Sequence, residues 1–424
     1  MAPTGLRSRL HAARNDRAAA MPFIMFTALI DMIAIGLIIP VLPALVGSFT
    51  ADKGDQALWY GVVTFAFSFA NFFGSPILGA LSDSYGRRPV LLIGFSGLMI
   101  SFFTTAVATS LAMLIGIRLV AGAMQANLSV ANAYVADITP PEQRARRFGM
   151  LGAMFGVGFI LGPVIGGLLG SINLRLPFYA AGGLALVNLT YGYFVLPESL
   201  PASRKHPVDW KTANPLSSLR RLAQLKGAAP LAVVVSCCGL AQFVLYTCWV
   251  LYTTFKFGWG PRDNGWSLAA VGVVSAISQG VLLGRLLKLV SVRRLAVMGL
   301  ISSTIAYALW GAATQSWMMY AIIFVNVLGS TTSSSIQSII SSAAEAQDQG
   351  KTLGAVGGLN SLMAVIAPAI GAPLLTMVSH LPKGDWRIGT PFYFCATLQA
   401  VALLLTVLHF RNQRRARLAV HAAA

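Results

Sequence analysis

Twelve long apolar stretches constrain this chain more than any other feature of its sequence. A helix needs about 20 apolar residues to cross a bilayer, and each stretch is about that long. Only 10% of the 424 residues are charged, whereas a soluble domain carries about 25%. In lipid, runs this long and continuous satisfy their backbone hydrogen-bonding groups by forming helices. We therefore expect an all-α integral membrane protein with helices near residues 22–46, 58–80, 89–109, 111–136, 148–170, 177–197, 229–252, 265–287, 295–314, 317–343, 352–378 and 389–410.

The chain has a net charge of +18, and the placement of its basic residues indicates the membrane topology. Most lysines and arginines fall in the two tails and in alternate loops, including the central loop. An excess of this kind marks cytoplasmic segments, so we expect both termini and the central loop in the cytoplasm. No soluble module is long enough to present a basic face, so no nucleic-acid partner is expected. The first apolar run, residues 21–46, is too long for a signal peptide and is interpreted as the first span.

The residues that enzymes and metal sites need do not occur in the required patterns. The four cysteines lie inside predicted spans without ligand spacing, and the five histidines lie in tails, loops or at a terminal edge. The sequence has no H-E-x-x-H, no G-x-x-x-x-G-K-[ST] and no G-x-S-x-G motif. We expect no enzyme, no metal site and no cofactor. Any transport would be driven by an ion gradient, because a nucleotide-binding loop is missing.

An internal repeat divides the predicted helices into two sets of six. At one constant offset the repeat aligns Gly79 with Gly284, Gly149 with Gly354, Gly152 with Gly357, Pro163 with Pro368 and Gly166 with Gly371. We expect two six-helix bundles, residues 22–197 and 229–410, with a central loop at 198–228 and tails at 1–21 and 411–424.

A short charged loop between two apolar runs is the most specific motif. Residues 79–91 read Gly-Ala-Leu-Ser-Asp-Ser-Tyr-Gly-Arg-Arg-Pro-Val-Leu. This loop resembles the signature of the major facilitator superfamily, which lies between the second and third helices. The resemblance implies a secondary transporter of two pseudo-symmetric bundles around a central cavity. It also implies a monomer, because each chain would enclose its own pathway.

Three further segments narrow the resemblance. Helix one reads Asp-Met-Ile-Ala-Ile-Gly-Leu-Ile-Ile-Pro from Asp31, helix four contains Arg118-Leu-Val-Ala-Gly, and helix six closes with Leu196-Pro-Glu-Ser. Together they are similar to the tetracycline-resistance branch of drug/proton antiporters. That branch implies a bacterial inner-membrane exporter that exchanges a drug for protons.

The sequence also departs from that branch. Its members carry acids in helices three and nine and a histidine in helix eight, where this chain has Ser101, Ser303 and Ser275. A serine cannot titrate near neutral pH, so tetracycline export by the branch's usual residues is left open.

One carboxylate remains as a candidate for ion coupling. Asp31 is the single member of the 13 acidic residues well inside a predicted span, and Arg118 is the comparable basic residue. Such charges are costly in lipid and usually serve a function. A carboxylate withdrawn from water also takes up a proton more readily. The alternatives are a structural hydrogen bond for Asp31 and, for Arg118, snorkelling to the interface.

Amides and aromatic residues in the spans are candidates for binding a bulky, partly apolar substrate. Many intramembrane amides only join helices, so about half of such residues are expected to touch substrate. The substrate-binding candidates are Asn71, Gln125, Asn127, Gln242, Tyr246, Trp249, Gln279 and Gln337.

Two motifs are candidates for gating. By resemblance, Asp83 would hold the end of helix five, and Arg87 or Arg88 would reach neighbouring acids, as a latch for the outward-open state. The alternative is that these arginines only mark topology. The glycine-proline run in helix five resembles an antiporter pattern and favours export, although it also fits a packing face. The gating candidates are Gly79, Asp83, Gly86, Arg87, Arg88, Gly162, Pro163, Gly166 and Gly167.

Together these patterns predict a proton-coupled exporter of a small amphipathic, drug-like compound. Two alternatives remain. One is a facilitator or importer of a metabolite that uses Asp31 to bind substrate charge. The other is a membrane protein of the same fold that binds a partner and transports nothing.

Overall fold

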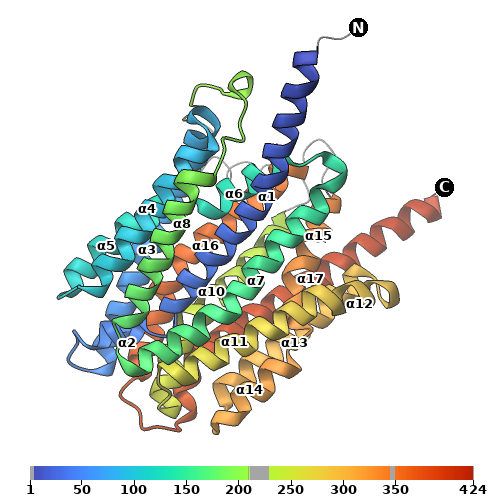
Figure 1. Cartoon of the computed structure of the whole chain (residues 1–424). Helices are drawn as coiled ribbons and strands as arrows, with labels where there is room; N and C mark the ends of the chain where they lie inside the picture. Colours follow the sequence, from blue (N-terminus) through green and yellow to red (C-terminus); the bar gives the residue numbers. More distant parts are fainter. Residues whose placement is uncertain (1–3, 209, 211–228, 344–348, 424) are drawn as a thin grey trace. The chain divides into compact units, whose positions relative to one another are not determined.

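The computed structural model describes residues 4–208, 210, 229–343 and 349–423. All twelve predicted stretches are helical within those residues. Most of the predicted central loop and parts of both predicted tails lie outside the described residues, so the predicted division into bundles stays a prediction. The α-helices are α1 Thr4–Ile38, α2 Leu42–Gly47, α3 Lys53–Tyr85, α4 Arg87–Ala106, α5 Leu111–Met124, α6 Asn127–Ile138, α7 Pro141–Ile172, α8 Leu176–Val195, α10 Ala229–Phe257, α11 Pro261–Ile277, α12 Leu283–Leu289, α13 Val292–Ala312, α14 Ser316–Val325, α15 Thr332–Ala343, α16 Gln349–Val378 and α17 Thr390–Ala423 (Figure 1).

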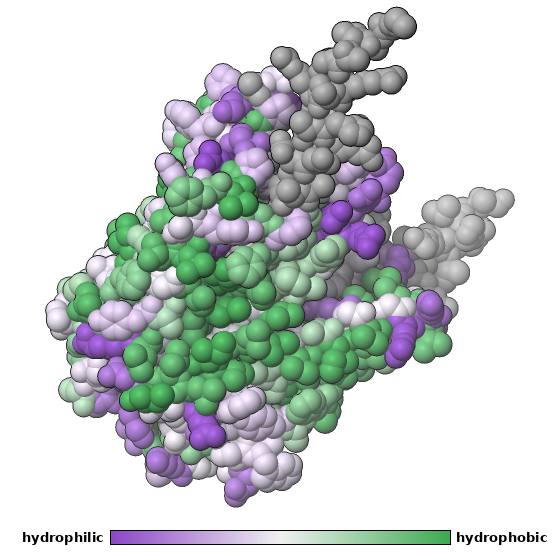
Figure 2. Space-filling model, in the orientation of Figure 1, coloured by the Kyte–Doolittle hydropathy of each residue, from purple (hydrophilic) through white to green (hydrophobic). Residues whose placement is uncertain are grey.

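Ten helical segments of the described chain are long and apolar enough to cross a membrane. A further pair, Ser316–Val325 and Gly329–Ser341, is bent by 51° and passes the same test as one span. Hydrophobic side chains cover much of the face drawn in Figure 2, and hydrophilic ones gather toward its edges. A surface of this kind is stable in lipid and unstable in water, so the chain is a multi-pass membrane protein.

The chain forms two compact units. Unit 1 comprises Met1–Leu45, Phe69–Asn214 and Pro261–Ala269, and unit 2 comprises Val46–Ser68, Pro215–Gly260 and Ala270–Ala424. In unit 1, α1 packs against α7 and α8, and in unit 2, α10 packs against α16 and α17. Phe23, Phe95 and Tyr134 belong to the buried core of unit 1, while Val234 and Leu300 belong to that of unit 2.

A glycine face brings α7 close to α1 in unit 1. A Cβ at Gly162 would lie 2.7 Å from the Cα of Gly36, and a Cβ at Gly166 would lie 2.7 Å from the Cα of Leu37. Neither position has room for a larger residue, because the obstacle is backbone. Gly156, on the same helix, has no such neighbour within 4 Å. The glycines of α7 therefore set the distance between α7 and α1, and α1 is the helix that carries Asp31.

Four predicted spans are irregular in their interior, and the first of them breaks at residues 39–41, between α1 and α2. The fourth stretch breaks at Gln125 and Ala126, between α5 and α6, and the tenth breaks after α14 and restarts through a 3-10 turn at Gly329–Thr331. The eighth contains a π-helix, Ser278–Leu282, between α11 and α12. Breaks release backbone groups that have to find new partners. The amide of Asn71 donates to the Gln125 carbonyl at 2.9 Å, and the Ser278 hydroxyl donates to the Val327 carbonyl at 2.9 Å.

Candidate functional site

The break between α5 and α6 positions a polar residue beside Asp31 in unit 1. Asp31 lies near the end of α1, within the apolar span Met21–Gly47, and is 5% exposed. Asn127 starts α6 directly after the break, and its Nδ2 donates to Asp31 Oδ2 at 2.8 Å. From α8, Asn188 Nδ2 donates to Asp31 Oδ1 at 3.0 Å. Each carboxylate oxygen thus accepts one amide hydrogen.

Two atoms around Asp31 have no hydrogen-bond partner among the described residues. They are Oδ1 of Asn188 and Oγ1 of Thr27, and both side chains are buried. Buried polar atoms without partners are uncommon and mark sites where a water, an ion or a second arrangement of the amide has a role. The surroundings of Asp31 therefore have spare hydrogen-bonding capacity that the described residues do not use.

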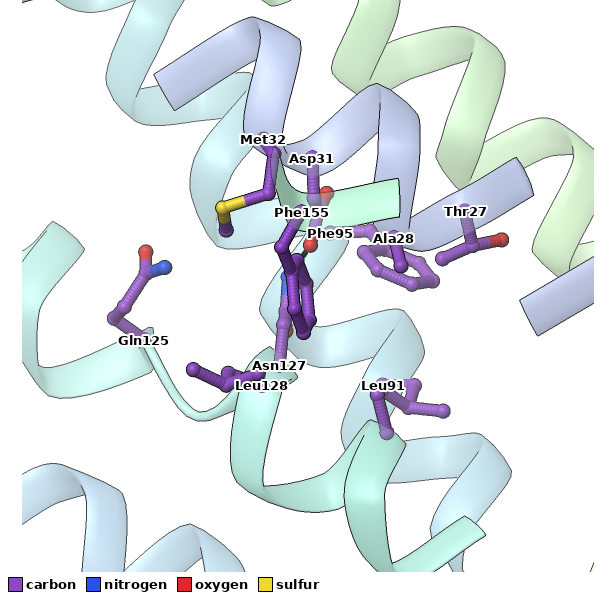
Figure 3. A pocket seen from close by; sticks show the side chains of 11 residues that line it. Thr27, Ala28, Asp31, Met32, Leu91, Phe95, Gln125, Asn127, Leu128 and Phe155 are labelled. Carbon is purple, nitrogen blue, oxygen red and sulfur yellow. Dashed lines mark hydrogen bonds between the residues drawn. The ribbon is translucent and has the colours of Figure 1, made fainter. Parts of the chain in front are cut away.

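A pocket opens beside this carboxylate within unit 1. It is small, with an enclosed volume of about 10 Å³, room for about one water molecule. Figure 3 shows Asp31 and Met32 on α1, Phe155 on α7, and Gln125 at the break before α6. The remaining lining residues are Thr27, Ala28, Leu91, Phe95, Asn127, Leu128 and Ala131. The lining is thus mainly apolar and aromatic, with one charged group and a few amide and hydroxyl groups.

The predicted candidates of the first half gather here. Asp31, Gln125 and Asn127 line the pocket, and Asn71 reaches the same break through the Gln125 carbonyl. Arg118 is buried on α5. Within the described chain, the Asp31 carboxylate bonds the two amides and forms no salt bridge with Arg118.

The candidates of the second half have separate surroundings in unit 2. Gln242 accepts a hydrogen bond from the Tyr307 hydroxyl at 3.3 Å. Trp249 is buried and meets the rings of neighbouring aromatic residues edge-on. Tyr246, Gln279 and Gln337 are exposed, and Gln279 lies in the π-helix. The serines that replace the branch's titratable residues are on α4 (Ser101, buried), α11 (Ser275) and α13 (Ser303, buried).

A second polar network joins the turn between α3 and α4 to two other elements of unit 1. Arg87 is buried, and its guanidinium bonds Asp83 at 2.5 Å, the Ser82 hydroxyl at 2.6 Å and Asp137, at the end of α6, at 3.0 Å. In the described residues Asp83 pairs with this arginine and not with the start of α7. The network therefore links three helix ends through one guanidinium.

Glu198, just after α8, completes this network. Its carboxylate accepts the backbone N–H of Arg87 at 2.8 Å and of Arg88 at 3.2 Å. An anion at this position compensates the unpaired N–H groups and the dipole at the start of α4. Gly86 has φ 118°, a conformation that favours glycine, and a Cβ there would collide with the Glu198 carboxylate. Gly79 has open space around it.

Asn188 and Glu198 were not among the site residues predicted from the sequence. Asn188 is an amide inside the predicted span 177–197, so the criterion that selected the other amides would have selected it as well. Its contact with Asp31 depends on the rotation of α8 against α1, which sequence spacing does not give. Glu198 belongs to the Leu-Pro-Glu-Ser segment quoted above. It caps the start of α4, and these contacts join residues about 110 positions apart, so the sequence does not reveal them.

Together these features define a multi-pass helical membrane protein with a carboxylate-bearing pocket among its spans. A model described as Major Facilitator Superfamily matches residues 24–252 and 231–423, and the chain belongs to that superfamily. It is a secondary transporter and not an enzyme.

Proteins of similar sequence support the resemblance to the tetracycline-resistance branch. The chain is 34% identical to the tetracycline resistance protein, class C, of Escherichia coli over 375 residues, 88% of this chain and 94% of that protein. It is 34% identical to the class D protein of Salmonella ordonez over 378 residues, 89% and 94% of the two chains. It is 27% identical to the human hippocampus abundant transcript 1 protein over 368 residues, which are 80% of this chain and 74% of that protein.

Solved structures confirm the fold. The human organic anion transporter MFSD10 (TETRAN) matches with a TM-score of 0.70 at 22% identity, covering 92% of this chain and 99% of that one. The nucleoside transporter NupG matches with a TM-score of 0.75 at 14% identity, covering 92% and 99%. These identities support the fold and carry no information on substrate.

Proposed function

We propose that this chain exports a small amphipathic, drug-like compound in exchange for protons. The tetracycline-type relatives and the glycine-proline face of α7 support export. The bacterial relatives support an inner-membrane location, and the positive charge of the tails and alternate loops supports cytoplasmic termini. We also propose that the transporter acts as a monomer.

The observation that carries this proposal is the Asp31 carboxylate. It is 5% exposed, it is held by two amides, and no cationic side chain of the described chain neutralises it. A buried acid without a counter-charge binds and releases a proton at moderate cost, whereas a permanently paired acid does not. Asp31 is therefore the proton-carrying group of the proposal, and Arg118 is a second candidate for coupling.

Binding and gating roles follow from the same placement. Asn71, Gln125 and Asn127 form the proposed substrate-binding group of unit 1, and Gln242, Tyr246, Trp249, Gln279 and Gln337 that of unit 2. The Arg87 network, with Asp83, Arg88, Gly79 and Gly86, would steady one transport state, because an ion-pair network at helix ends can form in one state and break in another. Gly162, Pro163, Gly166 and Gly167 would set the packing of α7.

Proton release from proteoliposomes tests the coupling. With a pH-sensitive dye inside and a panel of amphipathic drugs, wild type should give a substrate-triggered pH signal, and Asp31→Asn should abolish it. Asp55→Asn, an exposed acid at the start of α3, is the matched control and should behave as wild type. Facilitated uptake without any pH signal in wild type would replace this proposal with a facilitator. No transport of any compound would leave a protein that only binds a partner.

A glycine variant tests whether the Asn127 contact matters for coupling. A Cβ at Gly94, on α4, would collide with the Asn127 side-chain oxygen, so Gly94→Ala should turn this amide away from Asp31. We expect the pH signal to fall severalfold while the protein still folds. Gly183→Ala, on α8, adds the same methyl group where nothing lies within 4 Å. An unchanged signal in Gly94→Ala would remove Asn127 from the mechanism.

A further inference from the structure

Two side-chain oxygens beside Asp31 are not used by the arrangement described above. They are Oγ1 of Thr27 and Oδ1 of Asn188, which have no hydrogen-bond partner among the described residues. Thr27 is 2% exposed and Asn188 is 0% exposed, so solvent does not serve these oxygens. A buried polar atom without a partner lowers stability, and an apolar group of the same shape would avoid that loss. A second state of the site, in which both oxygens have partners, would account for their presence.

Thr27 and Asn188 are neighbours of each other as well as of Asp31. Thr27 precedes Asp31 by four residues on α1, a spacing that places both side chains on one face of the helix. From α8, Asn188 Nδ2 donates to Asp31 Oδ1 at 3.0 Å and to the Thr27 carbonyl at 3.3 Å. Figure 3 shows the Thr27 hydroxyl turned away from Asp31. The three residues therefore form one cluster, with a single hydroxyl directed out of it.

The two oxygens of the carboxylate offer a proton different surroundings. Oδ2 accepts from Asn127, whose own side-chain oxygen is packed so closely on Gly94 that a Cβ there would collide with it. Oδ1 accepts from Asn188, which also has an unused oxygen. A hydrogen on Oδ1 therefore arrives on the side of the carboxylate where hydrogen-bonding capacity is left.

No other titratable group of the described residues faces this carboxylate from the helices packed against α1, which are α6, α7 and α8. Helix α7 presents Phe155 to the pocket. The nearest titratable side chains along α6 and α8 are engaged elsewhere, since the Tyr134 hydroxyl donates to the Pro197 carbonyl and the Tyr191 ring packs on Phe23. A pH-dependent change in this cluster would therefore come from Asp31.

We propose that a proton on Asp31 closes a ring of three hydrogen bonds with Thr27 and Asn188. Thr27 turns about χ1, so that its hydroxyl accepts from the protonated Oδ1 and donates to Asn188 Oδ1. Asn188 Nδ2 continues to donate to the remaining lone pair of Asp31 Oδ1. Threonine in helices adopts two rotamers, so the turn is accessible. A water in the pocket does not replace this ring, because Thr27 lines the pocket and Asn188 does not.

The ring makes Thr27 and Asn188 positioning residues that stabilise the neutral acid. One O–H bond forms on Oδ1 with a proton from solvent and breaks when the proton leaves, and no other covalent bond changes. This inference rests on the proposed role of Asp31 as the proton carrier, and it adds the groups that hold the proton.

Infrared spectroscopy of the carboxyl group tests the ring. The C=O stretch of a protonated carboxyl falls in frequency when its O–H donates a hydrogen bond, and its intensity follows the protonated fraction. The purified full chain in detergent is titrated with acid, and the spectrum of Asp31→Asn is subtracted to isolate the band of Asp31. We expect wild type to show the band of a hydrogen-bonded acid.

Thr27→Val replaces the hydroxyl by a methyl group of the same shape. We expect the Asp31 band to rise in frequency and the proton affinity to fall about tenfold, so that the midpoint of protonation moves about one pH unit lower. Thr27→Ser keeps the hydroxyl and should match wild type. Thr190→Val, on α8, removes an exposed hydroxyl that donates to the Leu186 carbonyl at 2.8 Å, and should change neither quantity.

The sign of the shift separates the ring from a general loss of polarity, which would disfavour the charged acid and move the midpoint to higher pH. In alkaline solution, where Asp31 is ionised and the hydroxyl has no partner, Thr27→Val should be at least as stable to SDS as wild type. An unchanged band, or a midpoint at higher pH, in folded Thr27→Val would overturn the inference.

A double-mutant cycle tests closure through α8. Asn188→Leu removes the oxygen that completes the ring, so adding Thr27→Val to it should change the Asp31 band less than Thr27→Val does alone. Additive changes would mean that the two residues act separately and that no ring forms.

These outcomes are distinct from failure of the proposed function. Protonation is measured at equilibrium without substrate or membrane, so it does not depend on transport. If proteoliposomes show drug export coupled through Asp31 while Thr27→Val titrates as wild type, the ring is wrong and the export proposal stands. If the band behaves as expected but no compound is transported, the ring is correct and the export proposal fails.

Discussion

Unit 1 and unit 2 each contain a span that breaks in its interior, and the two breaks have different surroundings. In unit 1 the break leads to Asn127, which donates to the buried carboxylate of Asp31. In unit 2 it leads to Asn326, whose side-chain oxygen accepts from the Ser302 hydroxyl at 2.9 Å. Asp31 is the one acid among the buried residues of the described chain. The interrupted span thus borders a carboxylate in unit 1 and neutral hydrogen-bonding groups in unit 2.

The same contrast recurs at two helix starts. In unit 1, the start of α4 receives the Glu198 carboxylate and lies next to the buried Arg87. In unit 2, the start of α13 is capped by Ser291, whose hydroxyl accepts the Arg294 N–H at 3.4 Å. A neutral hydroxyl cap contributes about 1 kcal/mol. Removing one partner from a buried ionised network leaves an uncompensated charge and costs about 3 to 5 kcal/mol, so unit 1 is more sensitive than unit 2 to the loss of a charge at a helix start.

The largest expected difference between the units comes from removing one arginine in each. Arg87→Gln leaves Asp83 and Asp137 without their shared cation and should lower the free energy of unfolding by about 3 kcal/mol. This is the low end of the range for buried pairs, because Asp83 is 60% exposed. Arg293→Gln, in unit 2, removes an exposed hydrogen bond to Gln413 and should cost less than about 1 kcal/mol. Unfolding of the full chain in mixed micelles, titrated with SDS, measures both.

Equal losses in the two variants would mean that the Arg87 network is no more important than a surface contact. The comparison between the units would then have to rest on Asp31 alone.

A pair of glycines that the repeat aligns gives the next largest difference. Gly166→Ala places a methyl group against the backbone of Leu37, which cannot move without shifting α1, so we expect a loss of about 2 kcal/mol. Gly371→Ala meets the sulfur of Cys248 at 2.9 Å and the Val244 side chain at 3.3 Å. Side chains can turn aside, so its cost should stay below about 1 kcal/mol.

The same SDS titration ranks these two variants, and Gly156→Ala on α7 sets the baseline for an added methyl group in open space. A larger loss in Gly371→Ala than in Gly166→Ala would show that α16 is packed more tightly on its neighbours than α7.

The apolar stretches were enough to predict the fold class and where the helices lie, because length and hydropathy decide whether a segment can span lipid. Of the twelve predicted spans, ten pass as spans in the described chain, or eleven with the bent pair. The apolar stretches could not predict the interior breaks. Gln125 leaves the helix because its carbonyl has a partner in Asn71, 54 residues away, and no local pattern encodes that contact. Asp31 was found because a carboxylate in a span is costly and therefore conspicuous. Asn188 was missed although it is an amide in a predicted span, and only its contact with Asp31, which depends on the register of two helices, lay beyond the sequence.

The smallest expected effect concerns an exposed ion pair of unit 2, at its edge. The Arg387 side chain hydrogen-bonds Asp385, which lies just outside the last span, and lowers the pKa of that carboxyl. A lowered pKa adds stability above the carboxyl's ordinary pKa, and this contribution is lost as the pH falls through the lowered value. Asp385→Asn can still cap the turn at Trp386–Gly389, so the variant isolates the charge. Its melting temperature should lie slightly below wild type at neutral pH, and the gap should close in acid. A gap that stays constant with pH would mean that Asp385 acts as a cap alone.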